Sequence, residues 1–118
     1  KIQLIGSKLA DGQGVGDETV IGKAVIPTYA QEAIDKAVEG GVLVTKTTDK
    51  DYLPAIEKSS ALVVENGGLT SPAAVVGISM GIPVIVGVKD ATSVISDGQL
   101  ITVDSRRCLV YRGASNAL

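Results

Sequence analysis

The residues with the clearest potential for chemistry lie in a short turn that leads into a helix, Gly67-Gly68-Leu69-Thr70-Ser71-Pro72-Ala73. Paired glycines let the backbone approach a ligand closely, and the start of a helix presents free N–H groups and a partial positive charge. Two neighbouring hydroxyls would add donors. The pattern therefore predicts an anion site, for a phosphate or a carboxylate, made by Gly67, Gly68, Thr70, Ser71 and Ala73.

The same turn also has a purely structural interpretation, in which it only begins a helix. Thr70 or Ser71 suits the capping position, and Pro72 suits the first helical position because its φ angle is already helical. Pro72 also removes one N–H donor, and Glu65 brings a negative charge close to the turn. The sequence leaves the anion site and the structural helix start both open.

Few other residues offer chemistry. The chain has no histidine, and its one cysteine, Cys108, falls in an apolar segment predicted to be a strand, where a thiol is usually inert. Asp49 and Asp51 alternate on a predicted loop, where solvated carboxylates are usual, so we expect no metal and no cofactor in this chain. Residues 12–16 are glycine-rich like a nucleotide loop, but 17–19 lead into a strand, so we interpret them as a turn or a flexible connection.

The composition is that of one domain over residues 1–118. The formal net charge is −2 and the basic residues are dispersed, which argues against nucleic-acid binding. No apolar run reaches the ~18–20 residues that cross a membrane. A single cysteine excludes an internal disulfide and suits a reducing cytosol, so we expect a cytoplasmic protein.

The elements that must position the turn are marked by local signals. A helix is predicted over residues 73–80, ended by Gly81 and Pro83, and a strand over 84–86. The other predicted strands cover residues 1–5, 19–26 (with a bulge at Gly22), 42–45, 61–64, 99–103 and 108–112. The other predicted helices are one over 30–39 capped by Thr28, one from about Tyr52, and a single helical turn at 92–95. Residues 97–98 predict a hairpin-type turn, and 114–118 predict a frayed tail. This order predicts a mixed α/β domain, with one sheet covered by helices and a second sheet region made by the two ends.

Three motifs carry a resemblance: Gly67-Gly68-Leu69-Thr70-Ser71 with 73–76, then 81–87, then Ala91-Thr92. Together they resemble the mobile (swivelling) domain of phosphoenolpyruvate-utilising enzymes. The resemblance implies an α/β fold with three layers, β/β/α, of the phosphohistidine type. Phosphotransfer members carry the phosphoryl group on a histidine where this chain has Pro72, and often an arginine where it has Ile78. Pro72 is therefore a degenerate phospho-acceptor position.

A larger set of segments, 41–45, 48–51, 73–77, 81–88, 97–98, 101–104 and 110–113, resembles the extra C-terminal domain of bacillus-type and staphylococcal-type pyruvate kinases. The resemblance implies an excised accessory domain that is not catalytic itself and that stabilises or regulates its parent. The implied parent is a homotetramer that transfers phosphoryl from phosphoenolpyruvate to ADP in glycolysis, with Mg²⁺ and K⁺ held by its earlier domains. The implied partners are those domains and the neighbouring subunits. The alternatives are a binding module for a small phosphorylated ligand at residues 67–73 and, less favoured, a phosphocarrier.

Overall fold

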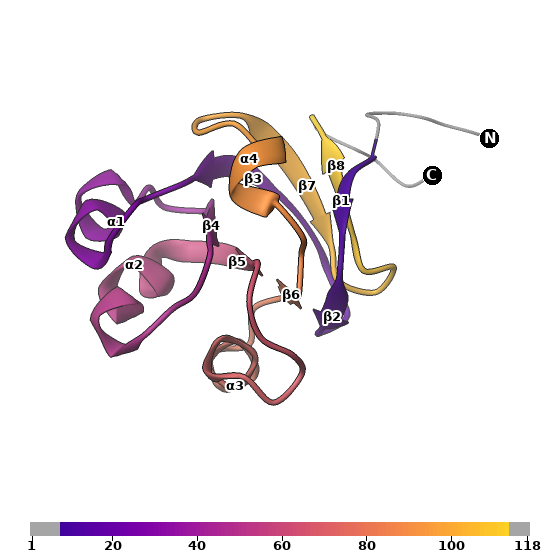
Figure 1. Ribbon diagram of the computed structural model, residues 1–118, viewed down its shortest axis with the longest axis horizontal. Coiled ribbons are helices and arrows are strands. Elements are labelled where there is room, and N and C mark those ends of the chain that lie inside the picture. Colours follow the sequence, from indigo (N-terminus) through magenta and orange to yellow (C-terminus); the bar gives the residue numbers. More distant parts are fainter. Residues whose placement is uncertain (1–7, 114–118) are drawn as a thin grey trace.

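The computed structural model describes residues 8–113 (Figure 1). The strand predicted over 1–5 and the tail predicted over 114–118 lie outside the described residues. Within the described part, eight strands form one curved mixed sheet in the order β1-β8-β7-β3-β4-β5-β6-β2. The strands are β1 (Lys8–Asp11), β2 (Gln13–Val15), β3 (Thr19–Val25), β4 (Gly41–Thr45), β5 (Ser59–Val64), β6 (Val84–Val86), β7 (Leu100–Asp104) and β8 (Leu109–Arg112).

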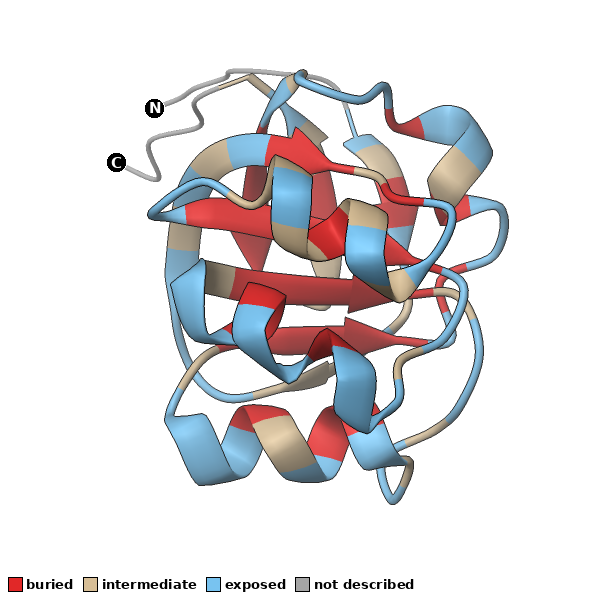
Figure 2. Ribbon diagram, turned by 90° about the vertical axis from the view of Figure 1, so that its left-hand side faces the viewer, coloured by how far each residue is buried: buried red, intermediate tan, exposed pale blue. Residues whose placement is uncertain are grey.

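Helices α1 to α3 cover one face of the parallel strands, and α4 lies on the other side (Figure 1). The helices of residues 8–113 are α1 (Ala30–Lys36), the 3₁₀ helix η1 (Lys50–Tyr52), α2 (Leu53–Lys58), α3 (Pro72–Met80) and α4 (Ala91–Val94). Figure 2 shows the strands buried behind these helices, whose residues alternate between buried and exposed. Because the parallel strands are covered on both faces, β4 is buried along its whole length.

Strand β3 joins the two halves of the sheet. Its residues Thr19 to Lys23 pair antiparallel with β7, whereas Ala24 and Val25 pair in parallel with β4. Strands β1 and β2 are separated only by Gly12, yet they pair with β8 and β6 at opposite ends of the strand order. The sheet therefore curls until its two edges lie close together.

Two hydrophobic cores separate three layers. The first lies between the antiparallel and the parallel halves of the sheet, includes α4, and is made by Ala10, Ala24, Val42, Val44, Ala61, Val63, Ile85, Val88, Ala91, Ile95, Ile101, Val103 and Val110. The second lies between the parallel half and helices α1 to α3, and is made by Val25, Ala33, Leu43, Tyr52, Ala55, Ile56, Leu62, Val64, Ala73, Ala74, Val84 and Val86. This arrangement confirms the predicted β/β/α fold.

Helix α1 is shorter than predicted and is capped differently. It ends at Lys36 and not at residue 39, because Ala37 is extended and the chain must turn back into β4. That turn is closed by a hydrogen bond from the Gly41 N–H to the Val38 carbonyl at 3.0 Å. The predicted Thr28 cap is also wrong, since the cap residue is Tyr29 and the Thr28 N–H instead donates to the Glu32 carboxylate.

Two glycine predictions near the N-terminus are also corrected. The β3–β7 register runs without interruption through Gly22, so there is no bulge. A Cβ atom at Gly22 would lie 2.5 Å from the Gly40 carbonyl oxygen, so the close approach of that backbone explains the glycine. Residues 12–16 are not a free turn or a flexible connection, because residues 13–15 form β2 and pair with β6.

The predictions for the end of the chain need two corrections. The turn at Asp97 and Gly98 is present but joins α4 to β7, so it is not a hairpin. It is fastened to β3, since the Ile26 N–H donates to Asp97 at 2.9 Å and the Gly98 N–H donates to the Ala24 carbonyl at 2.7 Å. Cys108 lies in a turn before β8, with φ of 62°, and not in a strand.

Candidate functional site

The predicted turn lies at the carboxyl end of the parallel strands. Strand β5 ends at Val64, and the chain then passes through residues 65–71 before α3 begins at Pro72. Strands β3, β4, β5 and β6 run in the same direction, so their carboxyl ends share one edge of the sheet. This edge is where open α/β sheets usually bind ligands.

The local sequence explains how α3 begins and ends. Pro72 is the first helical residue, as predicted, and Gly81 ends the helix in the left-handed conformation with φ of 71°. Gly77 is buried where α3 packs on β6, and a Cβ atom there would overlap with the Cγ2 atom of Val84. The helix start is thus held in place by close packing of α3 on the sheet.

Ser71 occupies the cap position, but its hydroxyl does not cap the helix. Its carbonyl accepts from the Val75 N–H at 3.0 Å, while its Oγ atom is buried and has no hydrogen-bond partner among residues 8–113. The predicted hydroxyl cap is therefore wrong, although the cap position is right. A buried hydroxyl without a partner is unusual in a folded protein, and it makes Ser71 a donor available to a ligand.

A small cavity of about 120 Å³ opens at this helix start. Its lining residues come from the ends of β4 and β5 and from α3: Thr47, Thr48, Val64, Asn66, Gly67, Ser71, Pro72 and Ala73. The N–H groups of Ala73 and Ala74 have no acceptor among the described residues, as expected for a first helical turn. Free N–H groups and an unpartnered hydroxyl therefore lie together, which is the chemistry an anion requires.

The structure brings together part of the predicted anion site. Gly67, Ser71 and Ala73 line the cavity, whereas Gly68 and Thr70 do not. Sequence reasoning missed Thr47 and Thr48, which follow β4 directly. Their position after a buried strand was the available signal, because carboxyl ends of neighbouring parallel strands meet at one edge.

The sequence suggests that Glu65 brings a negative charge close to the predicted anion site, but in the structure its carboxylate is bound to Thr92. Its Oε2 atom accepts from the Thr92 N–H at 2.8 Å and from the Thr92 hydroxyl at 2.5 Å. The hydrogen bond from the Thr92 side chain is the main cause that lowers the pKa of Glu65, with the Thr92 N–H and the charge of Lys46 acting in the same direction. The carboxylate is thus used at the first turn of α4, and Glu65 is not among the residues that line the cavity.

Asp49 and Cys108, the other candidate residues, both form hydrogen bonds within the protein. Asp49 accepts from the Asp51 N–H at 2.8 Å and caps η1. The Cys108 sulfur accepts from the Gly14 N–H at 3.2 Å. Among residues 8–113, no cluster of three or more histidine, cysteine, aspartate or glutamate side chains could hold a metal ion. No helix in the same range is both long and apolar enough to span a bilayer.

The fold and the site together define a three-layer β/β/α domain with a helix start suited to anions at the carboxyl edge of its parallel strands. The chain belongs to the family of PEP-utilising enzyme mobile domains, whose model matches residues 37–108. The resemblance noted in the sequence is thereby confirmed.

Curated relatives narrow the comparison to one group of enzymes. The chain is 61% identical to pyruvate kinase from Lactobacillus delbrueckii subsp. bulgaricus over 113 residues, which are 96% of this chain and 19% of that enzyme. It is 55% identical to pyruvate kinase from Geobacillus stearothermophilus over 118 residues, which are all of this chain and 20% of that enzyme. The chain therefore spans about one fifth of the length of the pyruvate kinases it matches.

Solved structures share the fold at low sequence identity. A solution structure of Enzyme I is 23% identical and has a TM-score of 0.57, with 72% of this chain and 34% of that chain covered. Aconitase X from Thermococcus kodakaraensis is 16% identical and has a TM-score of 0.69, with 89% of this chain and 98% of the matched chain covered. A likeness at these identities is evidence for the fold alone.

Proposed function

We propose that this chain is the accessory C-terminal domain of a pyruvate kinase and performs no catalysis itself. The observation that carries the proposal is the 61% identity to a pyruvate kinase over 96% of the chain. Pro72 stands where phosphotransfer members of the family resemblance carry histidine, and proline has no atom that could accept a phosphoryl group. The role of the domain is then to stabilise or regulate the enzyme.

The parent enzyme, in this proposal, transfers phosphoryl from phosphoenolpyruvate to ADP as a glycolytic enzyme of the cytoplasm. Mg²⁺ and K⁺ would be bound by its other domains. The partners of this chain are those other domains and the neighbouring subunits of a tetramer.

Helix α3 offers the surface through which the domain would pack on its parent. Residues 66–88 contain no charged side chain, although α3 is exposed on its outer face. On that face the side chains of Val75 and Ile78 are 56% and 63% exposed, and Leu69 lies exposed just before the helix. A helix that is apolar on all sides is usually buried on all sides.

The occupant of this face is the remainder of the pyruvate kinase chain, because the matched enzymes are about five times as long as this chain. Full burial of an aliphatic side chain contributes about 1.5–3 kcal/mol. Val75 and Ile78 are already partly covered, so each would contribute ~1 kcal/mol on packing against the parent.

The test replaces Val75 and Ile78 by lysine, both in the full-length pyruvate kinase and in the 118-residue chain. The full-length enzyme is expected to lose thermal stability or to change its response to effectors, while the unfolding free energy of the short chain changes by less than ~0.5 kcal/mol. Leu53→Lys is the matched control, since Leu53 is 42% exposed but lies on α2. Equal behaviour of the full-length enzyme with and without the α3 substitutions would contradict packing through this helix.

A second function, binding of a small phosphorylated ligand at the helix start, is favoured by the buried and unpartnered Oγ atom of Ser71. We expect inorganic phosphate to bind the 118-residue chain and Ser71→Asp to abolish that binding, because the new carboxylate would repel the anion. Ser79→Asp is the control, since Ser79 is an exposed serine on the same helix. Unchanged phosphate affinity in Ser71→Asp would count against the site.

A further inference from the structure

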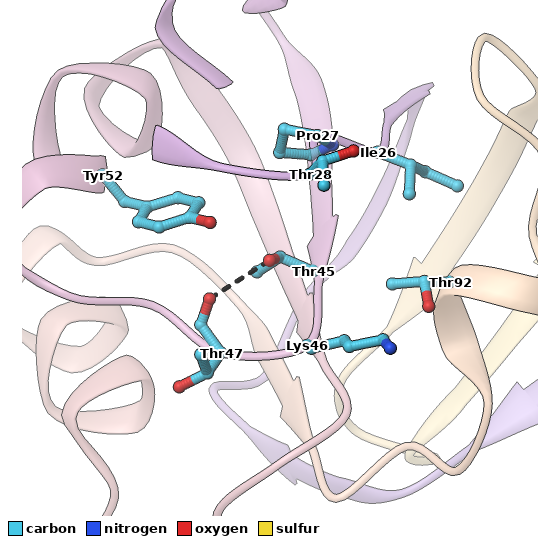
Figure 3. Close-up of a pocket in the computed structure, with 8 residues that line it drawn as sticks. All are labelled: Ile26, Pro27, Thr28, Thr45, Lys46, Thr47, Tyr52 and Thr92. Atoms are coloured by element: carbon cyan, nitrogen blue, oxygen red, sulfur yellow. Dashed lines mark hydrogen bonds between the residues drawn. The ribbon is translucent and has the colours of Figure 1, made fainter. Parts of the chain in front are cut away.

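A larger pocket lies at the carboxyl ends of β3 and β4 and has no part in the function proposed above (Figure 3). Its volume is about 550 Å³, which falls within the range of pockets that hold small molecules. The residues that line it are Ile26, Pro27, Thr28, Thr45, Lys46, Thr47, Tyr52 and Thr92. Only Thr47 is shared with the cavity at the helix start.

Tyr52 contributes an aromatic ring and a phenol hydroxyl to the pocket. The residue as a whole is only 7% exposed, so the ring is held in place by the core around it. Figure 3 shows the hydroxyl end of the ring directed toward Thr45, at one side of the pocket. Because Tyr52 lines the pocket, its hydroxyl can donate to a bound molecule while its ring stays packed in the core.

Lys46 supplies the charge of the pocket. It is the one charged residue in the lining, and it forms no ion pair among residues 8–113. Figure 3 shows its ammonium group across the pocket from Tyr52, on the side where Thr92 lies. The charge of Lys46 acts on the Glu65 carboxylate, but the two groups form no ion pair, and Glu65 accepts its hydrogen bonds from Thr92. The Lys46 ammonium group can therefore pair with an anionic group of a ligand.

Hydroxyl groups occupy the space between these two residues. The Thr45 hydroxyl donates to the Thr47 carbonyl at 3.1 Å, so its oxygen can still accept a hydrogen bond. Thr28 and Thr47 add two hydroxyls, and Ile26 and Pro27 make an apolar wall. One cation, one phenol and several aliphatic hydroxyls are a set that recognises a small molecule with one anionic group and several hydroxyl groups.

We propose that the pocket at the carboxyl ends of β3 and β4 binds a small polyhydroxylated anion with one anionic group, such as a sugar phosphate or a sugar acid. Lys46 pairs with the anionic group, and the Tyr52 hydroxyl donates to a ligand oxygen at the opposite end. The threonine hydroxyls accept from or donate to the ligand hydroxyls between them. The site is separate from the helix start, whose cavity is lined by Ser71 and Ala73.

The experiment follows the backbone amide resonances of the 118-residue chain while glucose 6-phosphate, gluconate, glucose or inorganic phosphate is added. We expect glucose 6-phosphate, gluconate or both to shift the resonances of the residues that line this pocket. Glucose and inorganic phosphate should bind to this pocket at least tenfold more weakly than the ligand that shifts those resonances. A response to one of the two anions identifies a phosphate or a carboxylate as the charged group. Lys46→Gln should reduce the affinity at least tenfold, the cost of one lost hydrogen bond to a charged group, and Tyr52→Phe should reduce it about threefold to tenfold, the cost of one lost neutral hydrogen bond.

Matched controls separate the pocket from the rest of the surface. Tyr29→Phe and Lys50→Gln change an exposed tyrosine and an exposed lysine that do not line the pocket, and both should bind like the unchanged chain. Tyr52→Phe removes one oxygen atom and keeps the ring, so it should fold. Three results would overturn the proposal: no shift of the lining resonances at millimolar ligand, equal affinity in Tyr52→Phe, or shifts confined to residues 71–74 at the helix start.

Discussion

Replacing Glu65 by glutamine is expected to lower the stability of the domain at neutral pH and to leave it almost unchanged in acid. The Glu65 carboxylate accepts both the N–H and the hydroxyl of Thr92, at 2.8 and 2.5 Å. It thereby satisfies the first turn of α4, where Asp90 at the cap position provides no side-chain hydrogen bond. This contact also ties the end of β5 to α4.

The expected magnitude follows from these two contacts. A hydrogen bond to a charged group contributes about 1.5–3 kcal/mol, against about 0.5–1.5 kcal/mol for a neutral pair. Glutamine keeps one oxygen that can accept from Thr92, so Glu65→Gln should cost ~1 kcal/mol. Alanine keeps none, so Glu65→Ala should cost ~2–3 kcal/mol.

The stabilising effect of the Glu65 carboxylate should weaken as the pH is lowered. Because the pKa of Glu65 is lowered in the folded state from its ordinary value of 4.5, the folded chain binds this proton less readily than the unfolded chain. The contribution of the Glu65 carboxylate to the free energy of unfolding is fully present above the ordinary pKa of 4.5. It is lost as the pH falls through the lowered pKa of the folded state. The difference in unfolding free energy between the unchanged chain and Glu65→Gln should therefore shrink toward acid.

The assay is urea denaturation of the 118-residue chain and of Glu65→Gln at pH ~7 and at a series of pH values below 4.5, the ordinary value from which the pKa of Glu65 is lowered. Thr92→Val and the double variant complete a mutant cycle that isolates the pair. A stability difference that is absent at neutral pH, or that does not shrink along the acid series, would contradict the prediction. So would additive effects of the Glu65 and Thr92 substitutions.

Two further substitutions test the packing of α3 and its first turn. Gly77→Ala should lower the unfolding free energy by ~1–3 kcal/mol, because its Cβ atom would overlap with Val84, even though alanine favours helices. Thermal or urea denaturation checks this against Ser79→Ala on the exposed face, and a stabilised Gly77→Ala would show that the packing is wrong. Ser71→Ala should keep or slightly raise stability, since it removes a buried hydroxyl without a partner. A loss above ~1 kcal/mol would mean that this hydroxyl caps the helix after all.

Segment 66–88 could be predicted from the sequence because its signals are local. Pro72 marks the first residue of α3, and Gly81 and Pro83 mark its end, so turn, helix and strand were placed within a residue. Residues 12–16 were misjudged because what makes them a strand is not local. Strand β2 forms by pairing with β6, some 70 residues along the chain, and Gly12 and Gly14 reflect close contacts with the distant backbone of Val86 and Ser105.

The candidate site was predictable only in part for the same reason. Gly67, Ser71 and Ala73 are neighbours in sequence and lie together at the cavity. Thr47 joins them because β4 and β5 are adjacent parallel strands. The position of Thr47 just after a buried strand was a signal, but the sequence does not state which strands are neighbours. The place of Tyr52 in the wall of its pocket likewise depends on how η1 packs against α1 and α2. The sequence patterns predict only that Tyr52 begins a helix.

The accessory role of the domain is tested by comparing the full-length pyruvate kinase with a version that lacks the region corresponding to this chain. Activity is measured against phosphoenolpyruvate concentration, with and without phosphorylated effectors, together with the melting temperature. We expect turnover at saturating substrates to persist, while the melting temperature falls or the effector response changes. Loss of turnover in a folded enzyme, or full retention of activity, stability and effector response, would contradict it.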